Sequence, residues 1–187
     1  AIRPDLTLPA TIELAELHRS GGDRGEALRL LQEAEGKATR PEAVVRLREQ
    51  LSQIWQDAGD YRKAEDVLER TLVEFKEEKE YISRAKLRIA GIADQAGRLD
   101  FAIKGYQEVA EANIDPAMTA AASFGHAALL RRVGRTSEAL PLMDKALAAL
   151  SIEGTALFNA GWVASRPRTR APCSWTRSAR CPWTSRP

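Results

Sequence analysis

The chain has 187 residues, 44% of them apolar, and no run approaches the roughly 18 apolar residues that a membrane-spanning helix needs. The net charge of +2 is unevenly distributed, because the final 23 residues carry six arginines and no acid. Residues 1–164 therefore carry 22 basic and 26 acidic side chains, and their net charge of −4 argues against duplex nucleic acid as a partner.

Four glycines recur at intervals of 37, 38 and 37 residues, at Gly22, Gly59, Gly97 and Gly134. Each is followed five residues later by an alanine and preceded, seven residues earlier, by another small residue. The alanines are Ala27, Ala64, Ala102 and Ala139, and the preceding residues are Ala15, Ser52, Ala90 and Ala127. Such a recurrence indicates one supersecondary unit copied along the chain. We expect four complete copies, at about residues 8–36, 42–77, 81–112 and 117–150.

The second copy shows how each unit is expected to fold. Apolar residues at three- and four-residue steps from 44 to 55 form one helical face, and a second face runs from 64 to 75. Gly59 between them favours the left-handed conformation that ends a helix. A connection this short makes the two helices antiparallel. Ser52 and Ala64 would face each other where the helices are closest, and a larger side chain there would cost roughly 1–3 kcal/mol.

Prolines and capping residues mark where several helices begin. Pro41 predicts the start of a helix in the second copy. Asp115 followed by Pro116 predicts an N-cap and a first helical residue in the fourth copy. Ser137 is the expected cap of the last complete helix, which would place Pro141 in the first turn, where proline is tolerated.

The pattern of small residue, glycine and alanine on helical hairpins resembles the tetratricopeptide repeat family over about residues 8–164. The resemblance implies an all-α fold, a right-handed α-solenoid of about four and a half stacked antiparallel helix hairpins. Two features depart from the family pattern. The period exceeds the usual value of about 34 residues, which implies longer helices or linkers. His18 and His126 also stand where large apolar residues are common.

The repeat pattern breaks near the end of the chain. Residues 155–164 read as a truncated fifth copy, because residues 156–164 align with 122–130. Residues 165–187 show no helical period, and we interpret them as a disordered basic tail or as the product of a reading-frame shift. Shifted codons allow a helix-like sequence over 172–178 that echoes residues 139–145. Because the chain begins at Ala1 rather than at methionine, we expect a fragment of a longer bacterial repeat protein.

No constellation of residues points to catalysis, a metal or a cofactor. His18 and His126 lie in different copies, and we interpret each as a packing residue. The two cysteines, Cys173 and Cys181, fall in the tail and lack the CxxC spacing of a metal site. The glycine-rich segment 21–25 lacks the lysine and the preceding strand of a phosphate loop, so we interpret it as a hairpin turn. The sequence predicts a protein that is not an enzyme and binds no cofactor or metal.

The resemblance implies a candidate peptide site, because the first helices of successive hairpins line a concave groove in this family. By alignment the groove presents Ile12, Glu16, Arg19, Glu49, Gln53, Gln56, Arg84, Arg88, Asp94, Phe124, Ala128, Arg131 and Arg132. This mixed polarity, basic toward the C-terminal end, suits an extended peptide with some acidic character. The alternative is that these arginines are solvated helix faces. The lysine–asparagine clamp of the chaperone-binding members is not matched, since those places hold Ile12 and Glu16, or Glu49 and Gln53.

Together these observations predict a non-enzymatic protein–protein interaction scaffold or adaptor. The expected partner is a peptide or helix of another protein, and neither nucleic acid nor a membrane span is expected. Two alternatives stay open. One is a regulatory or sensor segment of a larger enzyme or transcription regulator, and the other is a nucleic-acid or membrane binder that acts through the basic tail. The oligomeric state and the compartment, cytoplasm or cell envelope, also stay open.

Overall fold

The computed structural model describes residues 4–149, which form eight α-helices and no strand. The first helices of the hairpins have 17 residues each: α1 (Pro4–Ser20), α3 (Pro41–Asp57), α5 (Lys79–Gln95) and α7 (Pro116–Arg132). The second helices have 14 residues each: α2 (Arg24–Lys37), α4 (Tyr61–Glu74), α6 (Leu99–Ala112) and α8 (Thr136–Ala149). The predicted all-α fold is confirmed. The expected fifth copy at 155–164 and the tail at 165–187 lie outside the described residues.

Each hairpin turns through three residues, and the middle one is a glycine of the repeat pattern. These glycines have φ angles between +77° and +87°, where other residues are strained. At Gly59 the glycine N–H donates to the carbonyl of Gln56, and the N–H of Asp60 donates to that of Trp55, both at 3.0 Å. This pair of bonds is the Schellman motif, and equivalent bonds end α1, α5 and α7. The predicted role of the four glycines is therefore confirmed.

Two of the three predicted helix starts are confirmed, and the third is wrong. Pro41 and Pro116 are the first residues of α3 and α7, and the carboxylate of Asp115 accepts a hydrogen bond from the N–H of Met118 at 2.8 Å. The prediction for α8 is wrong, because this helix begins at Thr136 and Ser137 lies inside it. Pro141 therefore falls beyond the first turn, where its ring cannot donate the hydrogen bond that a helix normally makes.

The eight small residues of the repeat pattern are the most consistently buried part of the core. Each of them is no more than 5% exposed. Ala15 and Ala27 share one apolar cluster, as Ala90 and Ala102 share another. A Cβ atom added to Gly105 of α6 would lie only 3.0 Å from the Cβ of Ala90, so the backbones of α5 and α6 approach closely. Small side chains therefore set the distance between paired helices.

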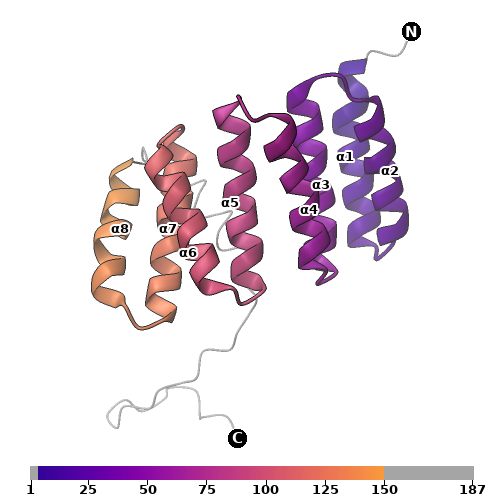
Figure 1. Cartoon of the computed structure of the whole chain (residues 1–187). Helices are drawn as coiled ribbons and strands as arrows, with labels where there is room; N and C mark the ends of the chain where they lie inside the picture. The colour runs from indigo at the N-terminus through magenta and orange to yellow at the C-terminus, as the bar shows by residue number, and fades with distance from the viewer. Residues whose placement is uncertain (1–3, 150–187) are drawn as a thin grey trace, which may run out of the picture.

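Figure 1 shows the four hairpins side by side in one array, with α1 and α2 at one end and α8 at the other. Each of α2, α4 and α6 packs against the first helix of its own hairpin and against that of the next hairpin. Consecutive first helices also pack on one another. Their outer edges form a continuous surface, which we call the first-helix face. Within residues 4–149, no helix is long and apolar enough to cross a membrane.

Candidate functional site

The first-helix face brings together four of the predicted groove residues, two from α3 and two from α5. Nε and Nη2 of Arg84 donate to the two carboxylate oxygens of Glu49, at 3.1 and 2.7 Å. Nη2 of Arg88 donates to the side-chain oxygen of Gln53 at 3.1 Å and to the main-chain carbonyl of Glu49 at 3.2 Å. Both arginines thus join α5 to α3, which does not fit the alternative that they are solvated helix faces.

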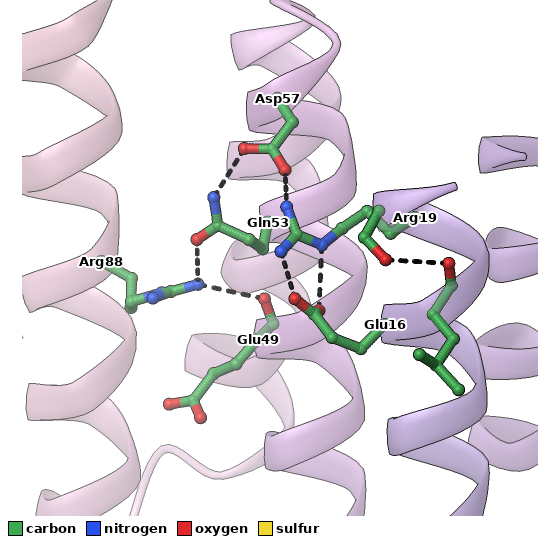
Figure 2. A network of polar contacts seen from close by, with 8 residues as sticks. Glu16, Arg19, Glu49, Gln53, Asp57 and Arg88 are labelled. Atoms are coloured by element: carbon green, nitrogen blue, oxygen red, sulfur yellow. Dashed lines mark hydrogen bonds and ion pairs between the residues drawn. The ribbon is translucent and has the colours of Figure 1, made fainter. Parts of the chain in front are cut away.

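The network continues onto α1, as Figure 2 shows. Arg19 of α1 bonds to Glu16 on its own helix and reaches across to Asp57 at the end of α3. Asp57 also accepts a hydrogen bond from Nε2 of Gln53 at 2.9 Å, and Gln53 in turn contacts Arg88. The hydrogen bond from Arg19 lowers the pKa of Glu16, so this carboxylate is charged at neutral pH.

Arg88 differs from its two neighbouring arginines in the kind of acceptor it contacts. Arg19 and Arg84 pair with carboxylates, whereas Arg88 donates to a carbonyl and to an amide oxygen, both neutral. The Nε atom of Arg88 is buried and has no hydrogen-bond acceptor among the described residues. Burial lowers the pKa of Arg88, and the nearby charge of Glu49 opposes that effect. The positive charge of Arg88 is therefore incompletely compensated.

Two open pockets lie on the first-helix face beside this network. One, of about 370 Å³, is lined by Ile12, Glu13, Glu16, Arg19, Gln50, Gln53 and Arg88. The other, of about 320 Å³, is lined by Leu8, Pro9, Ile12, Glu13, Arg46, Glu49, Gln50 and Arg84. Because Ile12, Glu13 and Gln50 line both pockets, we treat the two as one depression and call it the α1–α3–α5 groove.

The remaining predicted site residues do not line this groove. Arg132 of α7 forms an ion pair with Asp94 near the end of α5. Arg131 is exposed beside it, while Phe124 on α7 and Gln56 on α3 are half-buried. The structure therefore gathers seven of the predicted residues in the groove, and the other six lie elsewhere on the first helices. The seven are Ile12, Glu16, Arg19, Glu49, Gln53, Arg84 and Arg88, and the six are Gln56, Asp94, Phe124, Ala128, Arg131 and Arg132.

Comparison with known families fits this architecture. Residues 83–161 match a family model described as tetratrico peptide repeat. Residues 83–161 of the chain thus resemble tetratricopeptide repeats. No curated protein sequence matches the chain.

Three solved structures with a tetratricopeptide-repeat-like fold are similar to the chain. BtubC from P. vanneervenii has a TM-score of 0.62 at 16% identity, with 95% of this chain and 73% of that chain covered. A putative kinesin light chain from Podosopora anserina with nearly identical TPR-like repeats gives 0.58 at 20% identity, over 79% and 76% of the two chains. MamA gives 0.56 at 19% identity, over 80% and 81%. At these identities the likeness shows the fold alone.

Between α5 and α7 lies an aromatic ring, that of Tyr106, whose place the repeat pattern did not predict. A Cβ atom added to Gly125 would lie 2.7 Å from the ring of Tyr106, and one added to Gly91 would lie 3.5 Å from its hydroxyl oxygen. The ring of Tyr106, a residue of α6, therefore occupies space that two glycines leave free between α5 and α7. Burial raises the pKa of Tyr106 to about 12, and the charge of Asp94 adds to the effect. The sequence contained one signal for this arrangement, namely that Gly91 and Gly125 stand inside helical runs, where glycine often indicates close packing.

The chemistry that these residues can perform is recognition of charged and polar groups. Among residues 4–149, no group of three His, Cys, Asp or Glu side chains is placed to hold a metal ion. His18 lies 3.7 Å from Asp23 at the first hairpin turn, and His126 is half-buried with a pKa lowered by burial. The two histidines thus lie apart in different hairpins, and the α1–α3–α5 groove is the candidate site of this chain.

Proposed function

We propose that this chain is a non-enzymatic interaction scaffold whose α1–α3–α5 groove binds an extended segment of a partner protein, with an acidic side chain of that segment at Arg88. Stacked helical hairpins support such a role, because they offer a continuous surface along which a peptide can lie. The observation that carries the proposal is Arg88, a largely buried guanidinium that is held by neutral oxygens and lines an open pocket.

The buried Nε of Arg88, unpartnered within residues 4–149, favours an acidic group at this point of the pocket. Arg19 is already neutralised by Glu16 and Asp57, so the two charges of this pocket that no ion pair among the described residues compensates are those of Arg88 and Glu13. A carboxylate that joins Arg88 gains a charge-assisted hydrogen bond, which is stronger than the present bonds to neutral oxygens. Ile12 lines both parts of the groove and offers an apolar contact for a neighbouring side chain of the peptide.

A phage-displayed library of random dodecapeptides, panned against the full chain, tests this proposal. The selected peptides are expected to be enriched in Asp and Glu. The affinity of the strongest peptide, measured by fluorescence anisotropy, should fall by about tenfold to a hundredfold in Arg88→Gln, because a hydrogen bond to a charged group is worth about 1.5–3 kcal/mol. Replacing the peptide's acid by its amide should cause the same loss, and the two changes together should cost little more than either alone.

The matched control is Arg29→Gln, which removes an exposed arginine of α2 that lies outside the groove. This variant should bind the peptide like the parent, and circular dichroism should show that Arg88→Gln retains its helical content. Selected peptides without acidic residues, or equal affinity of the parent and Arg88→Gln, would show that Arg88 does not recognise the partner.

A further inference from the structure

The interface between consecutive hairpins repeats the same positions along the chain. On the first helices, positions 11 and 14 contain the residues that contact the preceding hairpin: Leu51 and Ile54 on α3, Ile89 and Ile92 on α5, and Leu129 on α7, where position 11 is His126. The five aliphatic residues are at most 8% exposed, and His126 is half-buried. Leu51 and Ile54 share a cluster with Leu31 of α2, as Ile89 and Ile92 do with Leu68 of α4 and Leu129 does with Tyr106 of α6. These positions therefore form the receiving half of each hairpin–hairpin interface.

On α1 the receiving half is present, but no preceding hairpin covers it within residues 4–149. Positions 11 and 14 of this helix are Leu14 and Leu17, apolar residues like their equivalents on α3 and α5. Leu14 is 45% exposed and Leu17 is 67% exposed. Terminal repeats of a soluble array normally carry a polar outer face. The α1 end instead keeps the apolar side chains of an internal repeat.

The other half of the interface comes from the second helices, at positions 5, 8 and 12. All nine residues at these positions in the three internal helices are buried or half-buried. They are Leu28, Leu31 and Glu35 on α2; Glu65, Leu68 and Leu72 on α4; and Ile103, Tyr106 and Ala110 on α6. In α8 they are Leu140, Met143 and Leu147. Leu140 is 61% exposed and Leu147 is 50% exposed. The α8 end is thus as apolar as the internal interfaces, and no other hairpin of residues 4–149 covers it.

We propose that the chain self-associates head to tail, with α8 of one copy packed on α1 of the next. The chain already forms this hairpin–hairpin interface three times internally. Because its two ends carry the two complementary halves of the same interface, a second copy can continue the array at either end. Figure 1 places the two surfaces at opposite ends of the array, which prevents one copy from satisfying both by itself. An interface between unlike surfaces does not close in a dimer, so we expect open-ended assemblies that grow with concentration.

Sedimentation velocity of the full chain between about 1 µM and about 1 mM tests the proposal. The α1-end variant is Leu14→Glu with Leu17→Glu, and the α8-end variant is Leu140→Glu with Leu147→Glu. The parent should form dimers and larger species as its concentration rises, whereas each variant alone should stay monomeric. The matched control is Val73→Glu on α4, where a 78% exposed apolar residue lies at neither end, and it should assemble like the parent.

Mixing the two variants gives the decisive measurement. Each keeps one intact surface, so an equimolar mixture should form one-to-one dimers that grow no further, and their formation would also show that both variants are folded. A monomeric parent at all concentrations overturns the proposal. If the α8-end variant still dimerises alone, the chain associates through a symmetric α1–α1 contact, and the head-to-tail proposal is wrong. If the parent is monomeric and the α8-end variant melts at a lower temperature, residues 150–187 of the same chain cover α8, and the proposal is wrong.

Discussion

Replacing Arg48 by methionine is expected to lower the free energy of unfolding by about 3 kcal/mol, because it breaks a buried ion-pair network that joins three helices. Arg48 lies on α3, and its side chain is 8% exposed. Its Nε donates to Glu35 of α2 at 2.7 Å, and its Nη2 donates to Glu74 of α4 at 2.6 Å. The guanidinium carbon also lies 5.8 Å from the ring centroid of Phe75.

The size of this effect depends on the carboxylates that would remain. Glu35 is 15% exposed, and its other basic neighbour, Arg70, is 4.0 Å away and more than half exposed. The charge of Glu35 would therefore be left nearly uncompensated in a buried place. Glu74 is half-exposed and can turn to water. Removing one partner of a buried pair typically costs about 3–5 kcal/mol, and the exposure of Glu74 favours the lower end of that range.

Urea denaturation, followed by circular dichroism, measures how much the free energy of unfolding falls in Arg48→Met. The double variant with Glu35→Met should recover most of it, because replacing both members of a buried ion pair by apolar residues is often neutral or stabilising. The matched control is Arg29→Met, which removes exposed ion pairs on α2 and should leave the unfolding midpoint nearly unchanged. An Arg48→Met midpoint equal to that of the parent would show that the network contributes nothing to stability.

The Arg48 network was not predicted, although the repeat contains one signal for it. Glu35 occupies position 12 of α2, where α4, α6 and α8 carry Leu72, Ala110 and Leu147. An acid at a position that is otherwise apolar indicates a buried partner. The pattern does not say which helix supplies that partner, because an arginine side chain is long enough to reach several neighbouring positions. Arg48 lies only 13 residues further along the chain, but on the next hairpin.

The hairpin turns and the helix contacts were predictable, since they follow from local rules. A φ angle above +70° after a helix requires glycine, so Gly22, Gly59, Gly97 and Gly134 fix the turns without any tertiary information. The small residues recur because their spacing is the period of the structure itself. The 37-residue period consists of the 17- and 14-residue helices and two three-residue connections, and the 38-residue interval arises because residues 75–78 form a four-residue connection.

The groove was predictable only in its location. Alignment placed Glu49, Gln53, Arg84 and Arg88 on one surface, but it could not pair them. Arg84–Glu49 and Arg88–Gln53 are separated by 35 residues, whereas Arg19–Asp57 and Arg132–Asp94 are separated by 38. Both separations are compatible with a period of 37 or 38, because a long side chain can reach about one helical turn up or down the neighbouring helix. Whether an arginine pairs at a separation of 35 or of 38 residues depends on how the side chains pack, and the repeat pattern carries no information about that packing.

Replacing Ala102 by leucine is expected to destabilise the third hairpin by roughly 1–3 kcal/mol through overpacking. Ala102 of α6 is fully buried and shares a cluster with Ala90 of α5. The two helices are already close there, because a Cβ atom on Gly105 would lie 3.0 Å from that of Ala90. Three extra carbon atoms must therefore push α6 away from α5 or displace Tyr106, which belongs to the same cluster.

The melting temperature, measured by circular dichroism, should fall by roughly 2–12 °C for a chain of this size. Ala112→Leu is the matched control, since it makes the same change on the same helix at an exposed residue, and it should melt like the parent. Ala64→Leu should repeat the loss in the second hairpin, because Ala64 has the same position in α4 and is also fully buried. Parent-like melting of both buried variants would mean that small side chains do not set the distance between the paired helices, and the interpretation of the whole repeat pattern would have to change.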